Sequence, residues 1–203
     1  MEKSINDNYF FYFDQNRCTG CKACIVSCKD WNQLNPGPVS WRKIVSAEDE
    51  GTNEYDFKVL NVTYGCLHCA EPECVKACAS GAIKKDPETG MVIIDRKACT
   101  GLQQCVIACP YNAIYIADDQ QEPEMEEGWQ VRHPAQKCTM CWDRLAVGKK
   151  PACVDCCPQR ALDFGLVSDL EEKYGSNILL ERELKDVFKC EPTSPSIVFK
   201  KKR

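Results

Sequence analysis

The cysteines of this sequence are spaced as metal ligands. All 17 except Cys156 and Cys190 fall into four groups. Group one is C-x2-C-x2-C-x3-C (Cys18, Cys21, Cys24, Cys28), group two is C-x2-C-x4-C-x3-C (Cys66, Cys69, Cys74, Cys78), group three is Cys99, Cys105 and Cys109 with Leu102 in the gap, and group four is C-x2-C-x11-C-x3-C (Cys138, Cys141, Cys153, Cys157). Thiolates at such spacings can wrap an iron–sulphur cluster from one tight loop, while a further ligand comes from elsewhere.

Three of the groups end alike, which indicates an internal repeat. Their last cysteines begin the segments CASGAI (78–83), CPYNAI (109–114) and CPQRAL (157–162). Such repeats indicate repeated supersecondary units. In bacterial two-cluster ferredoxins the fourth cysteine of one run ligates the cluster of the other run. Because a short hairpin joins groups two and three, we expect these two groups to exchange ligands, and groups one and four to do the same.

Four ligand sets follow from this exchange. The first set is Cys18, Cys21, Cys24 and Cys157, the second is Cys28, Cys138, Cys141 and Cys153, the third is Cys66, Cys69, Cys74 and Cys109, and the fourth is Cys78, Cys99 and Cys105 with Leu102 at the non-ligand corner.

Composition and charge exclude other classes of protein. The net charge of −4 over 203 residues gives no basic footprint for nucleic acid. No apolar run approaches the roughly 20 residues that a membrane-spanning helix needs. The N-terminal stretch has no basic region followed by an apolar one and no twin-arginine pair, so we expect no export signal of its own. Because disulfides are rare in reducing compartments, metal binding is favoured over a disulfide framework.

Structural zinc is the main rival interpretation, because two C-x2-C pairs can bind one ion. Groups two and four alone fit that pattern. Zinc explains neither the three closely spaced cysteines at the start of group one nor the repeated ending after the last cysteine.

The stretches between the groups predict an α+β fold of two bacterial-ferredoxin-like units with short helices and small antiparallel sheets, one unit inserted in the other. The expected elements are strands at 9–14, 112–117 and 161–167, a hairpin over 82–95, helices over 24–32 and 105–110, a last helix capped by Ser168 and ended by Gly175, and a surface connection over 118–136. The expected units are 1–60 with 118–167 (groups one and four), the inserted 61–117 (groups two and three), and a C-terminal extension, 168–203.

From about residue 9 to 167 the sequence resembles the four-cluster iron–sulphur subunits of the dimethyl sulfoxide reductase family of molybdenum enzymes. The matching segments are RCTGCKACIVSCKDWN (17–32), GCLHCAEPECVKAC (65–78), DRKACTG (95–101), KCTMCWDRLAVGKKPACVDCCPQRAL (137–162) and the tail PSIVFK (195–200). The resemblance implies a paired ferredoxin fold, four clusters in a chain and a molybdopterin-containing catalytic partner. Many members also meet a membrane anchor that exchanges electrons with quinol.

Two residues depart from the family pattern. Ala79 stands where a proline often follows the cysteine, and Leu102 stands where most members have a ligand. Some relatives, such as nitrate reductase subunits, carry a non-ligand there and hold a three-iron cluster. Leucine has no atom that binds iron, so we expect three 4Fe–4S clusters and one 3Fe–4S cluster of higher potential. The alternatives are a four-iron cluster with an exogenous ligand, or an empty site.

Five residues outside these sets raise separate expectations. His68 is expected to tune a cluster by hydrogen bonding or to face a partner, and not to bind iron. Trp142 and Arg144 are expected to pack and to form a salt bridge. Cys156 is expected to be a buried free thiol, and Cys190 to be structural.

The sequence has no nucleophile–base set, phosphate loop or dinucleotide fingerprint. We therefore expect that the chain is not an enzyme by itself. We expect an electron-transfer subunit that carries electrons between a molybdopterin catalytic subunit and a membrane quinol anchor or other donor or acceptor. The alternatives are a polyferredoxin subunit of a hydrogenase or formate dehydrogenase complex and, from another class, a zinc-stabilised binding module. We expect a peripheral subunit at a membrane, exported with a partner or cytoplasmic, with no nucleic-acid partner and no membrane span.

Overall fold

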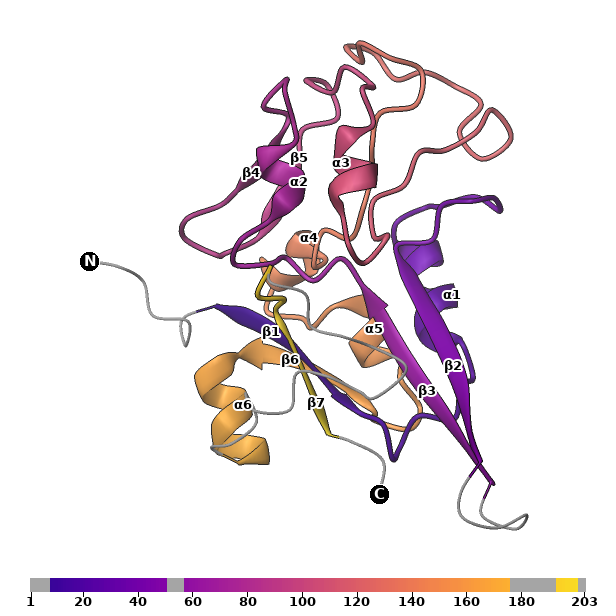
Figure 1. Cartoon of the computed structure of the whole chain (residues 1–203), viewed down its shortest axis with the longest axis vertical. Coiled ribbons are helices and arrows are strands. Elements are labelled where there is room, and N and C mark those ends of the chain that lie inside the picture. Colours follow the sequence, from indigo (N-terminus) through magenta and orange to yellow (C-terminus); the bar gives the residue numbers. More distant parts are fainter. Residues whose placement is uncertain (1–7, 51–56, 176–192, 201–203) are drawn as a thin grey trace.

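The computed structural model describes residues 8–50, 57–175 and 193–200. In Figure 1 a three-stranded sheet lies in the lower region, and a small hairpin with two short helices lies in the upper region. Within the described residues, no helix has the length and apolar character needed to cross a lipid bilayer.

The lower sheet has β1 (Tyr9–Asp14) at its centre. It pairs in antiparallel register with β6 (Leu162–Leu166) and in parallel register with β7 (Ile197–Lys200). Successive side chains of a strand point to opposite faces. Phe11 belongs to the main core, and Phe10 belongs to a separate cluster on the other face. Both faces of β1 are therefore covered, which explains its run of aromatic residues.

Two of these three strands are predictable from sequence. The strands expected at 9–14 and 161–167 are confirmed by β1 and β6. The third strand, β7, adds a parallel pairing to the antiparallel sheets that were expected. It also joins the C-terminal part of the chain to the sheet of the first predicted unit. The division into two units and an extension stays a prediction.

The last described helix, α6 (Val167–Tyr174), follows β6 directly. The sequence predicted a cap at Ser168, but Ser168 lies inside the first turn, and no side chain caps the helix at Leu166. Val167 is buried in the apolar cluster beside β1, and this burial favours a start two residues earlier than expected. Gly175 ends the helix with a φ of 110°, as predicted.

A long hairpin that the sequence analysis missed is formed by β2 (Arg42–Glu50) and β3 (Phe57–Gly65). Its buried side chains include Val62, but also Arg42 and Thr63, each 2 % exposed. Half-buried strands are recognised by alternating apolar and polar residues. Polar residues at buried positions break that alternation, so the pattern does not reveal the hairpin.

Three helices carry or follow the cysteines of groups one and four. They are α1 (Ala23–Trp31), α4 (Trp142–Leu145) and α5 (Ala152–Asp155), and α1 packs on α5. The helix expected over 24–32 is confirmed by α1.

The upper region contains α2 (Glu73–Lys76), β4 (Ile83–Lys85), β5 (Val92–Ile94) and α3 (Gln104–Ala108) (Figure 1). Strands β4 and β5 form the antiparallel hairpin that the sequence predicts. Helix α3 confirms the helix expected after the second cysteine of group three, in a shorter form.

The strand expected over 112–117 is wrong. This segment makes one isolated bridge, between Tyr115 and Gln136. Asn112 has a left-handed φ of 48°, and the N–H of Ala113 turns back toward a cysteine sulphur. The turn around this cysteine therefore prevents the segment from extending as a strand.

The connection over 118–136 is irregular, as expected, but one of its residues is anchored. Gln121 is buried; its side chain accepts a hydrogen bond from the N–H of Val39 at 2.7 Å and donates to the carbonyl of Asn35 at 2.6 Å. Asn35 donates in return to the carbonyl of Gln121 at 3.0 Å. These bonds fix the connection to the loop before β2.

Asp163 on β6 is a buried carboxylate that fastens α6 to the sheet. It accepts hydrogen bonds from Lys173 and Tyr174, both at 2.7 Å, and it pairs with Lys150. Burial works against ionisation, but these donors hold the pKa of Asp163 well below its usual range.

We predict that Asp163→Asn lowers the free energy of unfolding by about 1–3 kcal/mol, because its cationic partners lose a charged acceptor. Thermal unfolding under anaerobic conditions, followed by circular dichroism, measures the change. Asp119→Asn is the control: its side chain is 73 % exposed and pairs with Arg132 in solvent, where ion pairs contribute little. Equal effects of the two substitutions would contradict the role assigned to Asp163.

Candidate metal centres

The structure brings together the cysteines of each predicted set. One recess is lined by all four cysteines of the first set, and another by all four of the third. A further recess is lined by the cysteines of the fourth set and by Leu102. In the second set, the Cys28 thiol lies within electrostatic reach of the other three cysteines. The thiols of different groups that must be close together for ligand exchange are therefore close together.

The donor arrangement fits clusters better than single ions. The recesses of the first, third and fourth sets have similar empty volumes of about 320, 370 and 330 Å³, including their mouths. In the described part of the chain, no three His, Cys, Asp or Glu side chains converge closely enough to hold one ion. A structural zinc ion needs four ligands within about 2.3 Å. A cluster instead takes thiolates at separate corners, and three of the sets each line a single recess.

The same left-handed turn joins the first two ligand positions in every group. The residue before the second position has a φ between 43° and 74°, and it is Gly20, His68, Gly101 or Met140. Residues other than glycine seldom adopt such values. Its recurrence, even at His68 and Met140, indicates that the cysteine loop requires this turn.

The next cysteine of each group lies in the first turn of a short helix. Cys24, Cys74, Cys105 and Cys153 are each the second residue of α1, α2, α3 and α5. The first N–H groups of a helix lack intrahelical partners and carry partial positive charge. Sulphur ligands at these places therefore lie near backbone donors.

The repeated ending after the last cysteine also has a structural reason. The third residue after that cysteine is left-handed in three groups, with a φ between 48° and 67°: Gly81, Asn112 and Arg160. The turn brings the next N–H back to the cysteine. The N–H of Ala113 donates to Cys109 Sγ at 3.5 Å, and the N–H of Ala161 donates to Cys157 Sγ at 3.3 Å. The C-x-x-x-A pattern is thus a hydrogen-bonded turn around a sulphur ligand.

Burial prevents four free thiolates from coexisting in one set. In the third set, burial and neighbouring thiols raise the pKa of Cys69 to about 11 and that of Cys74 to about 12. In the second set, the same causes raise the pKa of Cys138 to about 11 and that of Cys153 to about 12. Four thiolates therefore need a compensating cation, and a metal bound by these sulphurs would supply it.

Leu102 lies on a loop with the geometry of a ligand loop. Gly101 and Gly20 have φ values of 74° and 71°, and the residues after Leu102 and Cys21 have values of 57° and 64°. Leu102 therefore occupies the position that Cys21 occupies in the first set. The loop has the shape of the Cys21 loop, with leucine at the position of the cysteine.

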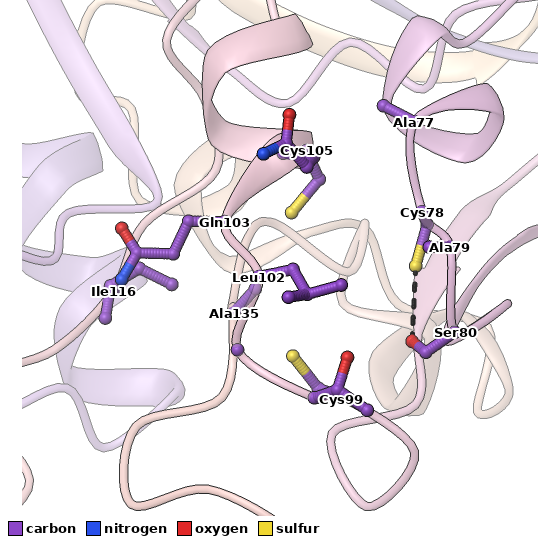
Figure 2. Close-up of a pocket in the computed structure, with 13 residues that line it drawn as sticks. Ala77, Cys78, Ala79, Ser80, Cys99, Leu102, Gln103, Cys105, Ile116 and Ala135 are labelled. Carbon is purple, nitrogen blue, oxygen red and sulfur yellow. Dashed lines mark hydrogen bonds between the residues drawn. The ribbon is translucent and has the colours of Figure 1, made fainter.

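Figure 2 shows the fourth set from inside its recess. Leu102 lies between Cys99 and Cys105, and its side chain is 60 % exposed. Partial burial would raise the pKa of Cys78, but the Ser80 hydroxyl, 3.6 Å from Cys78 Sγ, and nearby backbone N–H groups lower it. The recess thus presents three sulphurs and one corner that opens to solvent.

The four sets lie in a row. Cys153 of the second set is within electrostatic reach of Cys24 of the first. Cys138 of the second set is within reach of Cys66 of the third. The third and fourth sets share one apolar cluster. These contacts link the first set to the second, the second to the third, and the third to the fourth.

His68 is fully enclosed. It is 1 % exposed, so the expectation that it faces a partner is wrong, and its Nδ1 accepts a hydrogen bond from the N–H of Val92 at 3.0 Å. Burial, with Lys137 and Lys85 nearby, holds the pKa of His68 well below its usual value, so the ring is neutral. His68 thus connects the loop of group two to β5.

The expectation for Arg144 is confirmed, whereas the expectation for Trp142 is not. Arg144 forms the expected salt bridge, with Asp155, and its guanidinium lies 4.5 Å from the ring centre of Trp31. Trp142 is 62 % exposed, so the expectation that it packs is wrong. The short helix α4 follows Cys141 so closely that this side chain is left on the surface.

Cys156 is a free thiol, as expected, but it is half-buried and not fully buried, and it donates a hydrogen bond to the Cys153 carbonyl at 3.5 Å. It does not line the recess of the first set, whereas its neighbour Cys157 does. The expectation for Cys190 lies outside the described residues.

The chain is similar to known iron–sulphur proteins. The model of the 4Fe-4S dicluster domain matches residues 57–167. The chain is 40 % identical over 177 residues to the B component of the anaerobic dimethyl sulfoxide reductase of Escherichia coli, covering 84 % of this chain and 80 % of that one. It is 35 % identical over 169 residues to a thiosulfate reductase electron transfer subunit of Salmonella typhi, covering 82 % and 80 %. It is 36 % identical over 174 residues to the B component of the sulfite dehydrogenase of Allochromatium vinosum, covering 77 % and 68 %.

We predict that His68→Ala lowers the free energy of unfolding by about 2–4 kcal/mol, because it leaves a cavity and an unpaired N–H at Val92. His68→Asn should cost less, since asparagine tolerates a left-handed φ and offers a carbonyl acceptor. Neither change should lower the iron bound per chain, measured by mass spectrometry of the metal. A loss of iron in the folded His68→Asn protein would contradict this structural role.

Proposed function

This polypeptide belongs to the family of the iron–sulphur subunits of dimethyl sulfoxide reductases, and on that basis we propose that it is the electron-transfer subunit of a multi-subunit oxidoreductase. The observation that carries the proposal is the presence of four thiol sets, three of which each line one recess, while the thiols of the second set lie close together around Cys28. A row of closely spaced redox sites suits the movement of single electrons between two ends of a protein.

The proposed ligands are the fifteen cysteines of the four sets. The first set (Cys18, Cys21, Cys24, Cys157), the second (Cys28, Cys138, Cys141, Cys153) and the third (Cys66, Cys69, Cys74, Cys109) would each hold a 4Fe–4S cluster, and the fourth (Cys78, Cys99, Cys105) would hold a 3Fe–4S cluster.

When bound, these clusters supply one-electron donor and acceptor sites. The chain itself holds the thiolates, excludes water and donates hydrogen bonds to sulphur. The N–H of Met140 donates to Cys138 Sγ at 3.4 Å, and equivalent bonds reach Cys109 and Cys157. Hydrogen bonds to the sulphurs and exposure to solvent set the reduction potential of a cluster. The polypeptide thus controls the potential of each site, while catalysis falls to a partner.

The three-iron assignment at the fourth set follows from two features. The loop around Leu102 keeps the geometry of the Cys21 loop, which favours a bound cluster over an empty site. The side chain at that corner has no atom that binds iron, so the protein supplies no fourth ligand there. An iron at this corner would have no ligand from Leu102, so a cluster with three irons is the form that the residues best support.

The two ends of the row are where partners would meet the chain. At one end, Cys21 of the first set is exposed. At the other, Leu102 and Ile107 are 60 % and 79 % exposed beside the fourth set. We propose that a molybdopterin-containing catalytic subunit covers one end and that a membrane anchor or another redox protein covers the other. The chain would then be a peripheral subunit, held at a membrane through its partner.

Iron and sulphide analysis with low-temperature EPR tests this function on anaerobically purified protein. We predict about fifteen irons per chain and a sharp, near-isotropic signal in the oxidised state, as expected for three 4Fe–4S clusters and one 3Fe–4S cluster. Stoichiometric zinc in a colourless protein would contradict the proposal. About sixteen irons without that signal, or about twelve, would overturn the three-iron assignment alone.

Leu102→Cys is the matched variant for this measurement. A fourth thiolate at the Cys21-like position should capture one more iron, so the oxidised signal should disappear and the iron content should rise to about sixteen per chain. Leu102→Ala is the control, since it alters the same side chain without adding a ligand and should keep the oxidised signal.

The exchange of ligands between groups generates another prediction. Cys78 lies in group two but belongs to the fourth set, whereas Cys109 lies in group three but belongs to the third. We predict that Cys78→Ala abolishes the oxidised 3Fe–4S signal. Cys109→Ala leaves three cysteines in the third set, so it should keep the fourth-set signal and lose about one iron if a 3Fe–4S cluster forms in the third set, or about four if that cluster is lost. The opposite outcome, with the signal lost on changing Cys109, would mean that each group binds its own cluster.

A further inference from the structure

A buried arginine lies beside the first and second sets. Arg42, the first residue of β2, is 2 % exposed. Within the residues that the structure describes, no carboxylate forms an ion pair with it. Burying an unpaired charge is strongly unfavourable, so another negative charge must compensate Arg42.

Clusters bound in two neighbouring sets would supply the compensating charge through their ligand sulphurs. Burial alone would lower the pKa of the Arg42 guanidinium, but nearby cysteines raise it: Cys153, Cys24, Cys138 and Cys28. Cys24 belongs to the first set, and the other three belong to the second. Arg42 therefore lies in the electric field of both sets.

Two neighbours hold the guanidinium in place. Arg42 Nε donates to Thr63 Oγ1 at 3.2 Å, and Arg42 Nη2 donates to the Thr63 carbonyl at 3.3 Å. The central carbon of the guanidinium lies 4.9 Å from the ring centre of Phe11. Arginine is always charged and has no acceptor. The hairpin and β1 together therefore fix one positive charge in the interior.

Thr63 also contacts a ligand of the first set. Its Oγ1 lies 3.4 Å from Cys24 Sγ. Because Arg42 can only donate, Thr63 Oγ1 is the acceptor in their hydrogen bond, and its own proton is free to point elsewhere. The hydroxyl can therefore donate to Cys24 Sγ, and the donation strengthens when that sulphur carries negative charge.

We propose that Arg42 and Thr63 tune the electron-transfer row: the Arg42 charge raises the reduction potentials of both the first and second clusters, and Thr63 raises that of the first alone through its bond to Cys24. The proposal rests on the proposed function, since it requires clusters in these two sets. Reduction adds an electron to a site that is already negative. A fixed positive charge in a medium of low dielectric stabilises the reduced form more than the oxidised form.

The two residues act less strongly on the other end of the row. The cysteines of the third and fourth sets are not among those whose charge acts most strongly on Arg42. Arg42 therefore makes one pair of clusters better electron acceptors than their ligands alone would. A purely structural arginine would affect stability without selecting two of four potentials.

Redox titration of the full chain, followed by EPR, tests this proposal with variants that retain the native iron content. In Arg42→Met, the reduced-to-oxidised ratio at fixed potential should fall on the order of tenfold for two of the 4Fe–4S clusters, about 59 mV for one electron. Arg42→Lys keeps a positive charge and should restore most of this shift. The third 4Fe–4S cluster and the fourth-set cluster should keep their potentials.

Thr63→Val supplies a second test that conserves the side-chain shape. It removes the donor to Cys24 and leaves the Arg42 charge, so one 4Fe–4S potential should fall instead of two. Arg17→Met is the matched control: Arg17 precedes Cys18 but is exposed, and solvent screens its charge, so its effect should be much smaller.

Two results would overturn the proposal. One is unchanged potentials in Thr63→Val together with unchanged potentials in Arg42→Met. The other is an equal shift of every cluster, which would indicate a general loss of packing. Native protein without clusters would instead overturn the proposed function, so the two failures are distinguishable.

Discussion

The structure depends on one constraint, which is that many negatively polarised sulphurs must share a protein interior. Thiols such as Cys74 and Cys153 are buried, and burial together with their neighbours raises their pKa to about 12. Neither the second nor the third set can therefore ionise fully without added positive charge. Iron would supply most of it, and the polypeptide adds the rest through backbone N–H groups and the buried cation of Arg42. The interior is thus arranged around charge as much as around apolar packing.

The backbone meets this constraint by repeating one solution. Each group places a left-handed turn between its first ligand positions and a helix start at its next cysteine. In three groups, a backbone N–H after the last cysteine then lies close to the sulphur of that cysteine. The sheets have a supporting role. Strand β1 packs aromatic side chains against cysteines of the first and second sets, and the β2–β3 hairpin places Arg42 and Thr63 beside these two sets. The candidate ligands of this chain therefore lie on loops and short helices, and small sheets hold these loops in place.

The sequence predicts the sites better than it predicts the fold that holds them. Cysteine spacing and the repeated ending are enough to pair Cys157 with Cys24 and Cys109 with Cys66, because ligand exchange is a topological consequence of the repeat. The β2–β3 hairpin is not predicted from the sequence because Arg42 and Thr63 occupy buried positions and break the alternation of apolar and polar residues. These two residues lie beside the cysteines. The strand expected over 112–117 fails for a related reason, since the turn at Cys109 overrides its local propensity.

The central claim is that these thiols hold clusters. Mössbauer spectroscopy of protein enriched in ⁵⁷Fe tests it most directly, because it counts every iron by its environment. The account predicts that all iron lies in sulphur-coordinated clusters, with four-iron and three-iron components in a ratio of about twelve to three irons. Isolated iron–thiolate ions, or sites filled by zinc with little iron signal, would contradict it.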